Sequence, residues 1–307
     1  MKHFFKKLSL LSLLFVVIVL FLTLLLSVSL QSKKDDSFMA FFVKQEMLAN
    51  KHRQKTPAVI LLGGSNVAYG FNSEMLRDSL DMPAINAAVS RGLGLKFMMD
   101  HTSKYLTKGD ILVIAPEYHH FFGDCAYGEA LLANLFYIDP SISEDFNIKQ
   151  IKALIIDTKN LLRDYLTSFL GLQSKNFTFK VSDYNRYGDM AAHWTMPPRP
   201  YSHASSTDFQ AINKNFLDYY ENAVKSLRNK GVKVVIIPPS FAETSYSNVE
   251  EKLLPLFSEF ARRDLDFAIP PQEFAYPDSL FFDTHYHLGY AGIVLRTNRL
   301  INLMRAR

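Results

Sequence analysis

Ser65 lies where an α/β protein would place a nucleophile. It follows the apolar run 59–62 and a pair of glycines, Gly63 and Gly64. Glycine adopts backbone angles that other residues resist, so this pair lets the chain turn sharply at the end of a strand. In open α/β sheets ligands bind at the carboxyl ends of the strands, where a serine can expose its hydroxyl. An ordinary turn between a strand and a loop is the alternative interpretation.

Asp283, His285 and His287, near the other end of the chain, are of the types needed to activate a serine. An aspartate can hold an imidazole by one nitrogen while the other nitrogen takes the serine proton. In an extended loop His285 and His287 point the same way, so the spacing does not choose between them. With Ser65, these partners predict acyl transfer through a covalent intermediate. A polar surface loop is the alternative for this segment.

A third group of residues could stabilise the negative oxygen that forms in acyl transfer. Such a site needs backbone amides or side-chain donors aimed at that oxygen. We expect the amides of Ser65 and Gly92 to donate, with Gly94 as an equally good alternative. Asn66 is a candidate side-chain donor, and Ser90 is a candidate substrate-binding residue. A helix-capping turn would explain the glycine-bearing segment equally well.

Short β-rich runs and helical stretches alternate from residue 57 onward, which predicts an α/β fold with a parallel sheet covered on both faces. The runs are uniformly apolar, as buried parallel strands should be. The predicted strands are 58–62, 84–87, 111–115, 232–237 and, more weakly, 267–269. The predicted helices are 73–79, 95–106, 148–170, 209–229, 249–262 and 291–304.

An uncharged apolar stretch at 8–30 predicts a membrane-spanning helix. As a helix it would be about 34 Å long, enough to cross a bilayer core. A long cleaved signal peptide is the alternative, although Val28-Ser29-Leu30-Gln31 is a poor match to a cleavage site. Three lysines precede the stretch, and two lysines followed by two aspartates come after it, which weakly favours a cytoplasmic N-terminus. These flanking residues are Lys2, Lys6, Lys7, Lys33, Lys34, Asp35 and Asp36.

Composition narrows the function classes. The formal charge of +4 is concentrated in the flanks of the apolar stretch, and the rest of the chain holds 29 basic against 28 acidic residues. No basic stripe interleaved with aromatics is present, so nucleic acid is not an expected partner. The single cysteine, Cys125, fits an exported protein without disulfides. Glu117, His119 and His120 are not followed by a further ligand at fixed spacing, so we expect no metal. No glycine-rich cofactor loop is present.

These observations divide the chain into three parts. Residues 1–30 are expected to form a cytoplasmic tip and a transmembrane helix, 31–56 a stalk, and 57–307 the folded domain. Within that domain, about 119–207 breaks the alternation of strands and helices, and we interpret it as an insertion. Insertions at strand ends often build the substrate cleft. A surface subdomain without a ligand role is the alternative.

Three segments resemble the SGNH, or GDSL-like, hydrolase superfamily. They are Gly63-Gly64-Ser65-Asn66, 86–92, and 283–287 with the following Leu288. The resemblance covers about 57–305, although the motifs occupy only a small part of that range. It implies a flavodoxin-like three-layer α/β/α sandwich whose serine attacks acyl esters. The implied roles fall on Ser65 as nucleophile, Asp283 as the residue that orients the base, and Gly92 as oxyanion donor.

The sequence departs from this superfamily in two places. The usual Gly-x-Asn-Asp block is absent, because the predicted strand 111–115 runs into Pro116-Glu117-Tyr118, so the family's asparagine donor has no clear counterpart. The usual Asp-x-x-His becomes Asp-x-x-x-His if His287 is the base. A Tyr-His-Leu with this extra residue and the later Arg296-Thr297 resemble a membrane-anchored envelope branch, which includes alginate O-acetylation proteins and the D-alanine transfer protein of lipoteichoic acid. On this ground we expect His287, not His285, to be the base.

The resemblance implies a single-pass protein of the inner or plasma membrane with an extracytoplasmic catalytic domain. It would move acetyl or another small acyl group to or from an envelope polysaccharide, as an esterase if water is the acceptor and as a transferase if a sugar hydroxyl is. The implied partners are an envelope polysaccharide or acyl ester, the membrane, and a multi-pass membrane O-acyltransferase, with no cofactor. A catalytically silent glycan-binding or scaffold subunit of an envelope complex is the alternative, favoured by the missing asparagine block.

Overall fold

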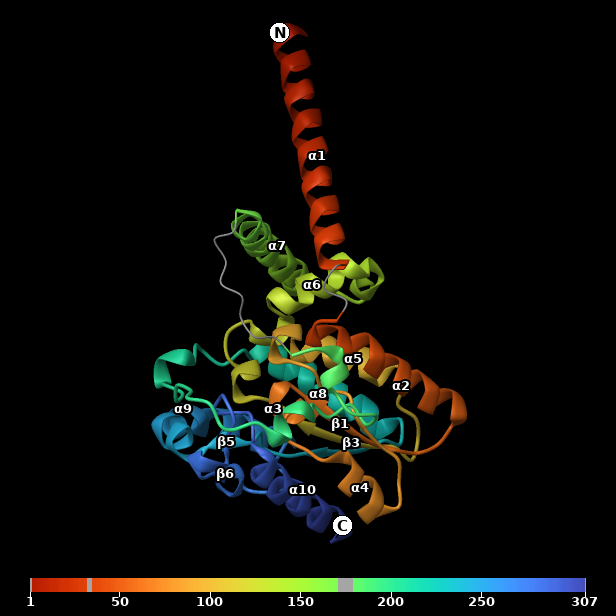
Figure 1. Ribbon diagram of the computed structural model, residues 1–307, viewed down its shortest axis with the longest axis vertical. Helices are drawn as coiled ribbons and strands as arrows, with labels where there is room; N and C mark the ends of the chain where they lie inside the picture. The colour runs from red at the N-terminus through yellow and green to blue at the C-terminus, as the bar shows by residue number, and fades with distance from the viewer. Residues whose placement is uncertain (1, 32–34, 171–178, 307) are drawn as a thin grey trace.

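A four-stranded parallel sheet forms the centre of the protein, with strand order β2-β1-β3-β4. The structure, a computed structural model, describes residues 2–31, 35–170 and 179–306 (Figure 1). Lys33 and Lys34, used above for the membrane orientation, lie outside the described residues. The strands are β1 (Val59–Gly63), β2 (Ala84–Asn86), β3 (Ile111–Ala115) and β4 (Lys233–Ile236). The α/β class and the parallel sheet expected from the sequence are confirmed.

Register places the ends of β1 and β3 side by side. Gly63 of β1 lies opposite Ala115 of β3, and Leu61 lies opposite Asn86 of β2. Because parallel strands share the edge at which they end, the residues that follow Gly63 and Ala115 are neighbours in space. This edge is where the candidate site forms.

The weak strand expected at 267–269 is not a strand in the structure. Its Ala268 amide donates a hydrogen bond to the Ile236 carbonyl at the end of β4, at 2.7 Å. A separate two-stranded parallel sheet forms from β5 (Phe241–Ala242) and β6 (Ala275–Tyr276). Beyond β4, the segment 267–269 therefore makes this one backbone hydrogen bond to the sheet and does not pair with β4 as a strand.

The two faces of the sheet carry separate apolar clusters. Ile60 and Leu62 of β1 pack with side chains of α2, α5, α8 and α9, whereas Val59 and Leu61 pack with α4 and α10. Successive side chains of a strand point to opposite faces, so the uniformly apolar β1 is buried on both sides. The helices are α2 (Ala40–Gln54), α3 (Ser65–Ala68), α4 (Ser73–Leu80), α5 (Leu95–Ser103), α8 (Lys214–Asn229), α9 (Glu243–Arg262) and α10 (Tyr290–Arg305).

Two helices begin away from their predicted positions. α8 starts at Lys214 and not at Phe209, because the Asn213 side chain accepts a hydrogen bond from the Phe216 amide at 3.0 Å and caps the helix. An asparagine in this place satisfies an amide that has no partner inside the helix. α9 starts at Glu243, earlier than 249, because β5 leads directly into it.

The segment expected to be a stalk is part of the folded core. Phe41 and Leu48 of α2 are buried in the cluster that covers one face of the sheet. The apolar residues between the two charged groups of this segment are therefore core residues, and the described part of 31–56 is not a free linker. Removing these apolar side chains from water stabilises the packing of α2 against the sheet.

The insertion and the apolar helix lie together at one end of the molecule. The insertion contains α6 (Ala130–Ile138) and α7 (Ile148–Phe169), and both contact α1 (Lys2–Gln31), which extends away from the sheet (Figure 1). Among the described residues, α1 is the one helix long and apolar enough to span a membrane. The candidate span is His3–Val28, with a mean hydropathy of 3.1. Short 3-10 helices occupy Ser37–Met39, Arg91–Leu93, Tyr118–Phe121, Cys125–Tyr127, Pro140–Ser143, Val181–Asp183, Ala192–Thr195, Ser206–Asp208, Pro271–Phe274 and Asp278–Leu280.

Candidate active site

Ser65 is the first residue of α3, directly after the turn that ends β1. The two preceding glycines are required for close packing and not for unusual backbone angles. A Cβ at Gly63 would overlap the Ala115 carbonyl, and a Cβ at Gly64 would overlap the Glu117 carboxylate. Gly64 itself has an extended backbone that other residues adopt. The glycines thus let β3 and the residues after it approach the serine.

Glu117 is the direct partner of Ser65. The Ser65 hydroxyl donates a hydrogen bond to Oε1 of Glu117 at 3.1 Å, and the Asn66 amide donates to the same oxygen at 3.1 Å. The carboxylate is only 2% exposed. Burial opposes its ionisation, yet the Arg91 guanidinium and the Asn66 backbone N–H hold the pKa of Glu117 below its usual value. An ionised carboxylate therefore lies directly beside the Ser65 hydroxyl.

The loop before α10 brings Asp283 and His287 together. An antiparallel bridge between Phe281 and Leu288 closes the loop, and the Phe282 amide donates to the His287 carbonyl at 2.8 Å. Oδ1 of Asp283 lies 2.7 Å from Nδ1 of His287. This pairing leaves Nε2 of His287 as the nitrogen that can accept a proton.

Tyr69 fixes the plane of the His287 imidazole. The two rings are stacked, with their centroids 4.1 Å apart and their planes 9° apart. Tyr69 directly follows α3, so the same short segment that presents Ser65 also supports the imidazole. Nothing in the sequence singles out Tyr69, because its role depends on a contact between residues far apart in the chain.

His285 lies in the same loop but has a different partner. Its Nδ1 lies 3.1 Å from the Ser202 carbonyl in the insertion. Burial outweighs this contact and lowers the pKa of His285. The loop is folded, so the two histidines do not behave as equivalent residues of an extended strand. Of the two, His287 is the one that the structure pairs with a carboxylate.

A cavity of about 350 Å3 joins these elements. Ser65, Ser90, Gly92, Glu117 and His287 all line it. The structure therefore brings together most of the residues singled out in the sequence, with Asp283 behind His287. In the structure no hydrogen bond joins Ser65 to His287, because the Ser65 hydroxyl is directed at Glu117. Hydrogen bonds between catalytic groups are often formed only in the substrate complex.

Asn66 does not line this cavity, which departs from the expectation that its side chain is an oxyanion donor. It is fully buried, and its Nδ2 donates to the Ala115 carbonyl at 3.0 Å. Arg296 of α10 donates to the Asn66 carbonyl at 2.7 Å and to its Oδ1 at 3.0 Å. Asn66 thus anchors the turn after β1. Burial lowers the pKa of Arg296 to about 10, so its guanidinium remains charged at neutral pH.

Glu117 gives the cavity no side-chain donor of the kind that an asparagine would supply. An ionised Glu117 can only accept hydrogen bonds. The Gly92 amide points to Oγ of Ser90 at 3.3 Å, a long contact. Ser65 begins a helix, where the first amides have no partner inside the helix. Arg91 also lines the cavity, and its guanidinium lies 3.8 Å from Glu129. Arg91 was missed in the sequence, although it stands inside the glycine-bearing segment.

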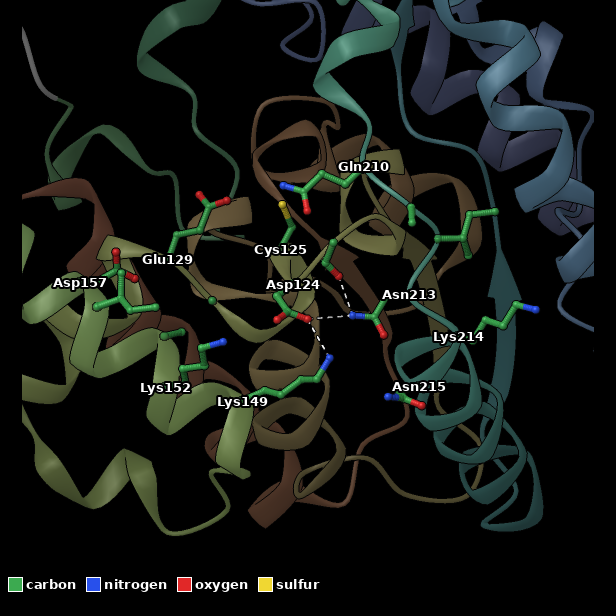
Figure 2. A pocket seen from close by; sticks show the side chains of 16 residues that line it. Asp124, Cys125, Glu129, Lys149, Lys152, Asp157, Gln210, Asn213, Lys214 and Asn215 are labelled. Atoms are coloured by element: carbon green, nitrogen blue, oxygen red, sulfur yellow. Dashed lines mark hydrogen bonds and ion pairs between the residues drawn. The ribbon is translucent and has the colours of Figure 1, made fainter.

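A second cavity, of about 680 Å3, adjoins the first. Glu129 lines both. Figure 2 shows it between the start of α7 and the segment before α8, with Lys149 and Asn213 both directed at Asp124. Lys149 lies 2.8 Å from Asp124, and Asn213 donates to it at 3.0 Å. The lining holds three lysines, three carboxylates and three carboxamides, so its charges balance.

His119 and His120 are buried and serve the packing of the site. His119 lies 3.1 Å from the Tyr286 hydroxyl and stacks on Phe209. Burial is the main cause that lowers the pKa of each imidazole to about 4, so both are neutral at physiological pH. Within the described residues, no cluster of three or more histidine, cysteine or acidic side chains could hold a metal ion.

The chain was compared with known protein families, curated proteins and solved structures. No protein-family model matches the chain, and neither the curated proteins nor the solved structures contain a significant match. The functional conclusion therefore rests on the site itself.

Proposed function

We propose that the chain is a membrane-anchored, SGNH-like serine esterase or O-acyltransferase with a flavodoxin-like three-layer domain. One observation carries the proposal: Ser65, at the end of a central parallel strand, shares a cavity with His287, which Asp283 holds by Nδ1. The strand order β2-β1-β3-β4 also agrees with a flavodoxin-like arrangement. The compartment is the extracytoplasmic side of the membrane, as the flanking charges of the apolar stretch favour.

The proposed reaction begins when an acyl ester enters the cavity and the Ser65 hydroxyl turns from Glu117 to Nε2 of His287. The serine oxygen forms a bond to the acyl carbon while His287 takes its proton. The ester bond breaks, and His287 returns the proton to the departing alkoxide. Water or a sugar hydroxyl then attacks the acyl carbon and gives its proton to His287. The bond between the acyl carbon and the Ser65 oxygen breaks, and His287 returns the proton to that oxygen. Asp283 stabilises the imidazolium in both steps.

The oxyanion is stabilised, in this proposal, by the Ser65 and Gly92 amides together with Arg91. A guanidinium at the cavity wall supplies the positive charge that offsets Glu117. The asparagine that the superfamily uses is thereby replaced by a different donor. A different donor is needed because an ionised Glu117 can only accept hydrogen bonds and cannot stabilise an oxyanion.

The substrate that the site supports best is an acyl ester of an envelope polysaccharide, acetyl being the smallest such group. The second cavity supports a glycan, because its balanced charges and its amides can hydrogen-bond to the hydroxyls of an uncharged sugar chain. A multi-pass membrane acyltransferase is the proposed partner that would supply the acyl group.

A fluorophosphonate probe tests the proposal directly, because it forms a bond only with an activated serine. The wild-type protein should be labelled and Ser65→Ala should not. Ser258→Ala, on the exposed surface of α9, is the matched control and should be labelled like the wild type. A correctly folded wild type that resists labelling would refute the enzyme.

A catalytically silent scaffold or glycan-binding subunit is the second candidate. Its specific support is the hydrogen bond from Ser65 to an ionised Glu117, which directs the hydroxyl away from His287. In that case the protein would bind polysaccharide with the same affinity whether residue 65 is serine or alanine, and no acyl transfer would accompany binding.

A further inference from the structure

The exposed face of α7 consists of apolar and basic side chains. Among the described residues of α7 the exposed ones are Ile148, Ile151, Lys152, Ile155, Ile156, Lys159, Arg163 and Leu166. Ile155 is 67% exposed and Leu166 52%. Ile148, Ile151 and Ile155 have the spacing that places them on one side of a helix. A helix with an apolar side flanked by lysines and arginines is typical of helices that lie in the membrane interface.

The position of α7 beside α1 indicates that the membrane covers this face. Leu26 and Leu30, in the last turns of α1, are 2% and 4% exposed, and α1 contacts both α6 and α7 in this region (Figure 1). A bilayer core is crossed by about 20 helical residues. Counted from the lysines that precede the apolar stretch, the core ends close to Leu26 and Leu30. α6 and α7 therefore touch α1 at the depth where hydrocarbon meets the lipid headgroups.

The charge of α7 fits anionic headgroups. The helix carries four basic residues against two acidic ones, Asp157 and Asp164. Asp157 lines the second cavity, and Asp164 lies 3.3 Å from Arg163. Lys149 and Lys152 line the same cavity, so Lys159 and Arg163 are the basic residues that the exposed side keeps. Basic side chains close to an anionic leaflet are attracted to its headgroups.

We propose that the exposed face of α7 lies in the membrane that α1 spans, in the leaflet on the side of the folded domain. The apolar side chains enter the boundary between headgroups and acyl chains, and Lys159 and Arg163 contact anionic phospholipids. The protein is then held at two places, by α1 across the bilayer and by α7 along its surface. Two anchors fix the orientation of the domain, which one flexible anchor does not.

This orientation sets where the candidate active site opens. α6 hydrogen-bonds to α7 through Tyr137 and Thr158, 2.8 Å apart, and its first residues, Ala130 and Leu131, line the catalytic cavity. A helix of this length spans about 14 Å. The distance between the cavity and the bilayer is therefore about the length of this short helix, about 14 Å. This consequence rests on the proposed function: the acyl donor is presented at the membrane surface, not in free solution.

Fluorescence quenching by lipid tests the placement of α7. In the full-length chain carrying Cys125→Ser, an environment-sensitive dye is attached at Ile155→Cys or Leu166→Cys. Leu254→Cys is the matched control, because Leu254 is also 52% exposed but belongs to α9, a helix that lies at the level of the sheet (Figure 1). The protein is reconstituted alone in vesicles of phosphatidylcholine and phosphatidylglycerol.

We expect the dye at 155 and 166 to emit at shorter wavelength, to lose most of its intensity with doxyl-labelled lipid, and to resist aqueous iodide. The dye at 254 should show the reverse. Behaviour at 166 equal to that at 254 would overturn the proposal. A shift that grows with protein concentration, without quenching by lipid, would show that a second copy covers α7 and would also overturn it. Adding Ser65→Ala should change none of these readouts. The placement of α7 is therefore tested independently of whether Ser65 is a nucleophile.

Discussion

The hydroxyl of Ser65 donates a 3.1 Å hydrogen bond to a buried carboxylate, Glu117, and this is the feature that most distinguishes the site. The contact follows from strand register. Gly63 and Ala115 are paired across β1 and β3, and Ser65 and Glu117 each lie two residues further on. The carboxylate also accepts the Asn66 amide. Glu117 therefore holds the nucleophile turn and at the same time competes with His287 for the serine proton.

Glu117→Gln separates these two roles. The amide oxygen of glutamine still accepts from Ser65, so the turn should persist and the rate of fluorophosphonate labelling should change by less than about tenfold, since a hydrogen bond contributes about 1 kcal/mol. Rates of labelling measured across a range of probe concentrations check this. A loss as complete as that of Ser65→Ala would assign Glu117, and not His287, as the base.

His287→Ala should lower the rate of ester cleavage by about 100-fold or more, because a positioned general base contributes at least that factor. His285→Ala should leave most of the activity, since its imidazole contacts the Ser202 carbonyl, whereas Asp283 pairs with His287. Hydrolysis of a chromogenic acetyl ester by the two variants, compared with the wild type, is the measurement. The opposite ranking would move the base to His285.

Arg296→Lys should weaken the turn that presents Ser65. The guanidinium donates to two oxygens of Asn66 and also to the Pro238 carbonyl at 3.3 Å, and an ammonium cannot reproduce this fork. We expect a loss of about 1.5–3 kcal/mol in the free energy of unfolding, the usual value of a hydrogen bond to a charged group. Urea unfolding and probe labelling measured together check it.

Arg305→Lys, at the exposed end of the same helix, is the matched control for Arg296→Lys. It should unfold at the wild-type urea concentration and keep its labelling rate. Equal behaviour of the two variants would show that Arg296 does not position the nucleophile turn.

Lys152→Ala and Asp157→Ala test the second cavity as the place where the sugar chain binds. Both side chains line it. With a glycan as acceptor, we expect KM to rise while the rate of probe labelling at Ser65 stays unchanged, because the serine is in the neighbouring cavity. Lys159→Ala is the control, since Lys159 lies on the exposed face of α7 outside the cavity. A fall in probe labelling with unchanged KM would contradict the assignment.

Lys44 gives a prediction on stability. Burial outweighs the attraction of Asp189 and lowers the pKa of Lys44 to about 7 from an ordinary 10.5. Between these pH values the unfolded chain binds a proton that the folded chain does not, so this group makes stability rise with pH from about 7 to 10.5, by at most about 1.4 kcal/mol per pH unit. Urea unfolding across this range should show a smaller rise for Lys44→Met. Equal slopes would contradict it.

Features that depend on neighbours along the chain could be predicted from the sequence alone. Apolar runs such as Ile111–Ala115 predicted the central strands, because a parallel strand buried on both faces has no room for polar residues. The length of the apolar stretch predicted a helix that could span a membrane. The position of Ser65 followed from the end of such a strand and the two glycines beside it.

Contacts between residues far apart in the chain become evident only in the folded molecule. A bridge between Phe281 and Leu288 folds the loop, so Asp283 meets His287 and His285 turns to the insertion. Register between β1 and β3 brings Glu117 to Ser65. α2, expected to be a stalk, packs on the sheet because its apolar side chains find a face there. Such pairings depend on which surfaces meet in space, and the order of residues along the chain does not encode them locally.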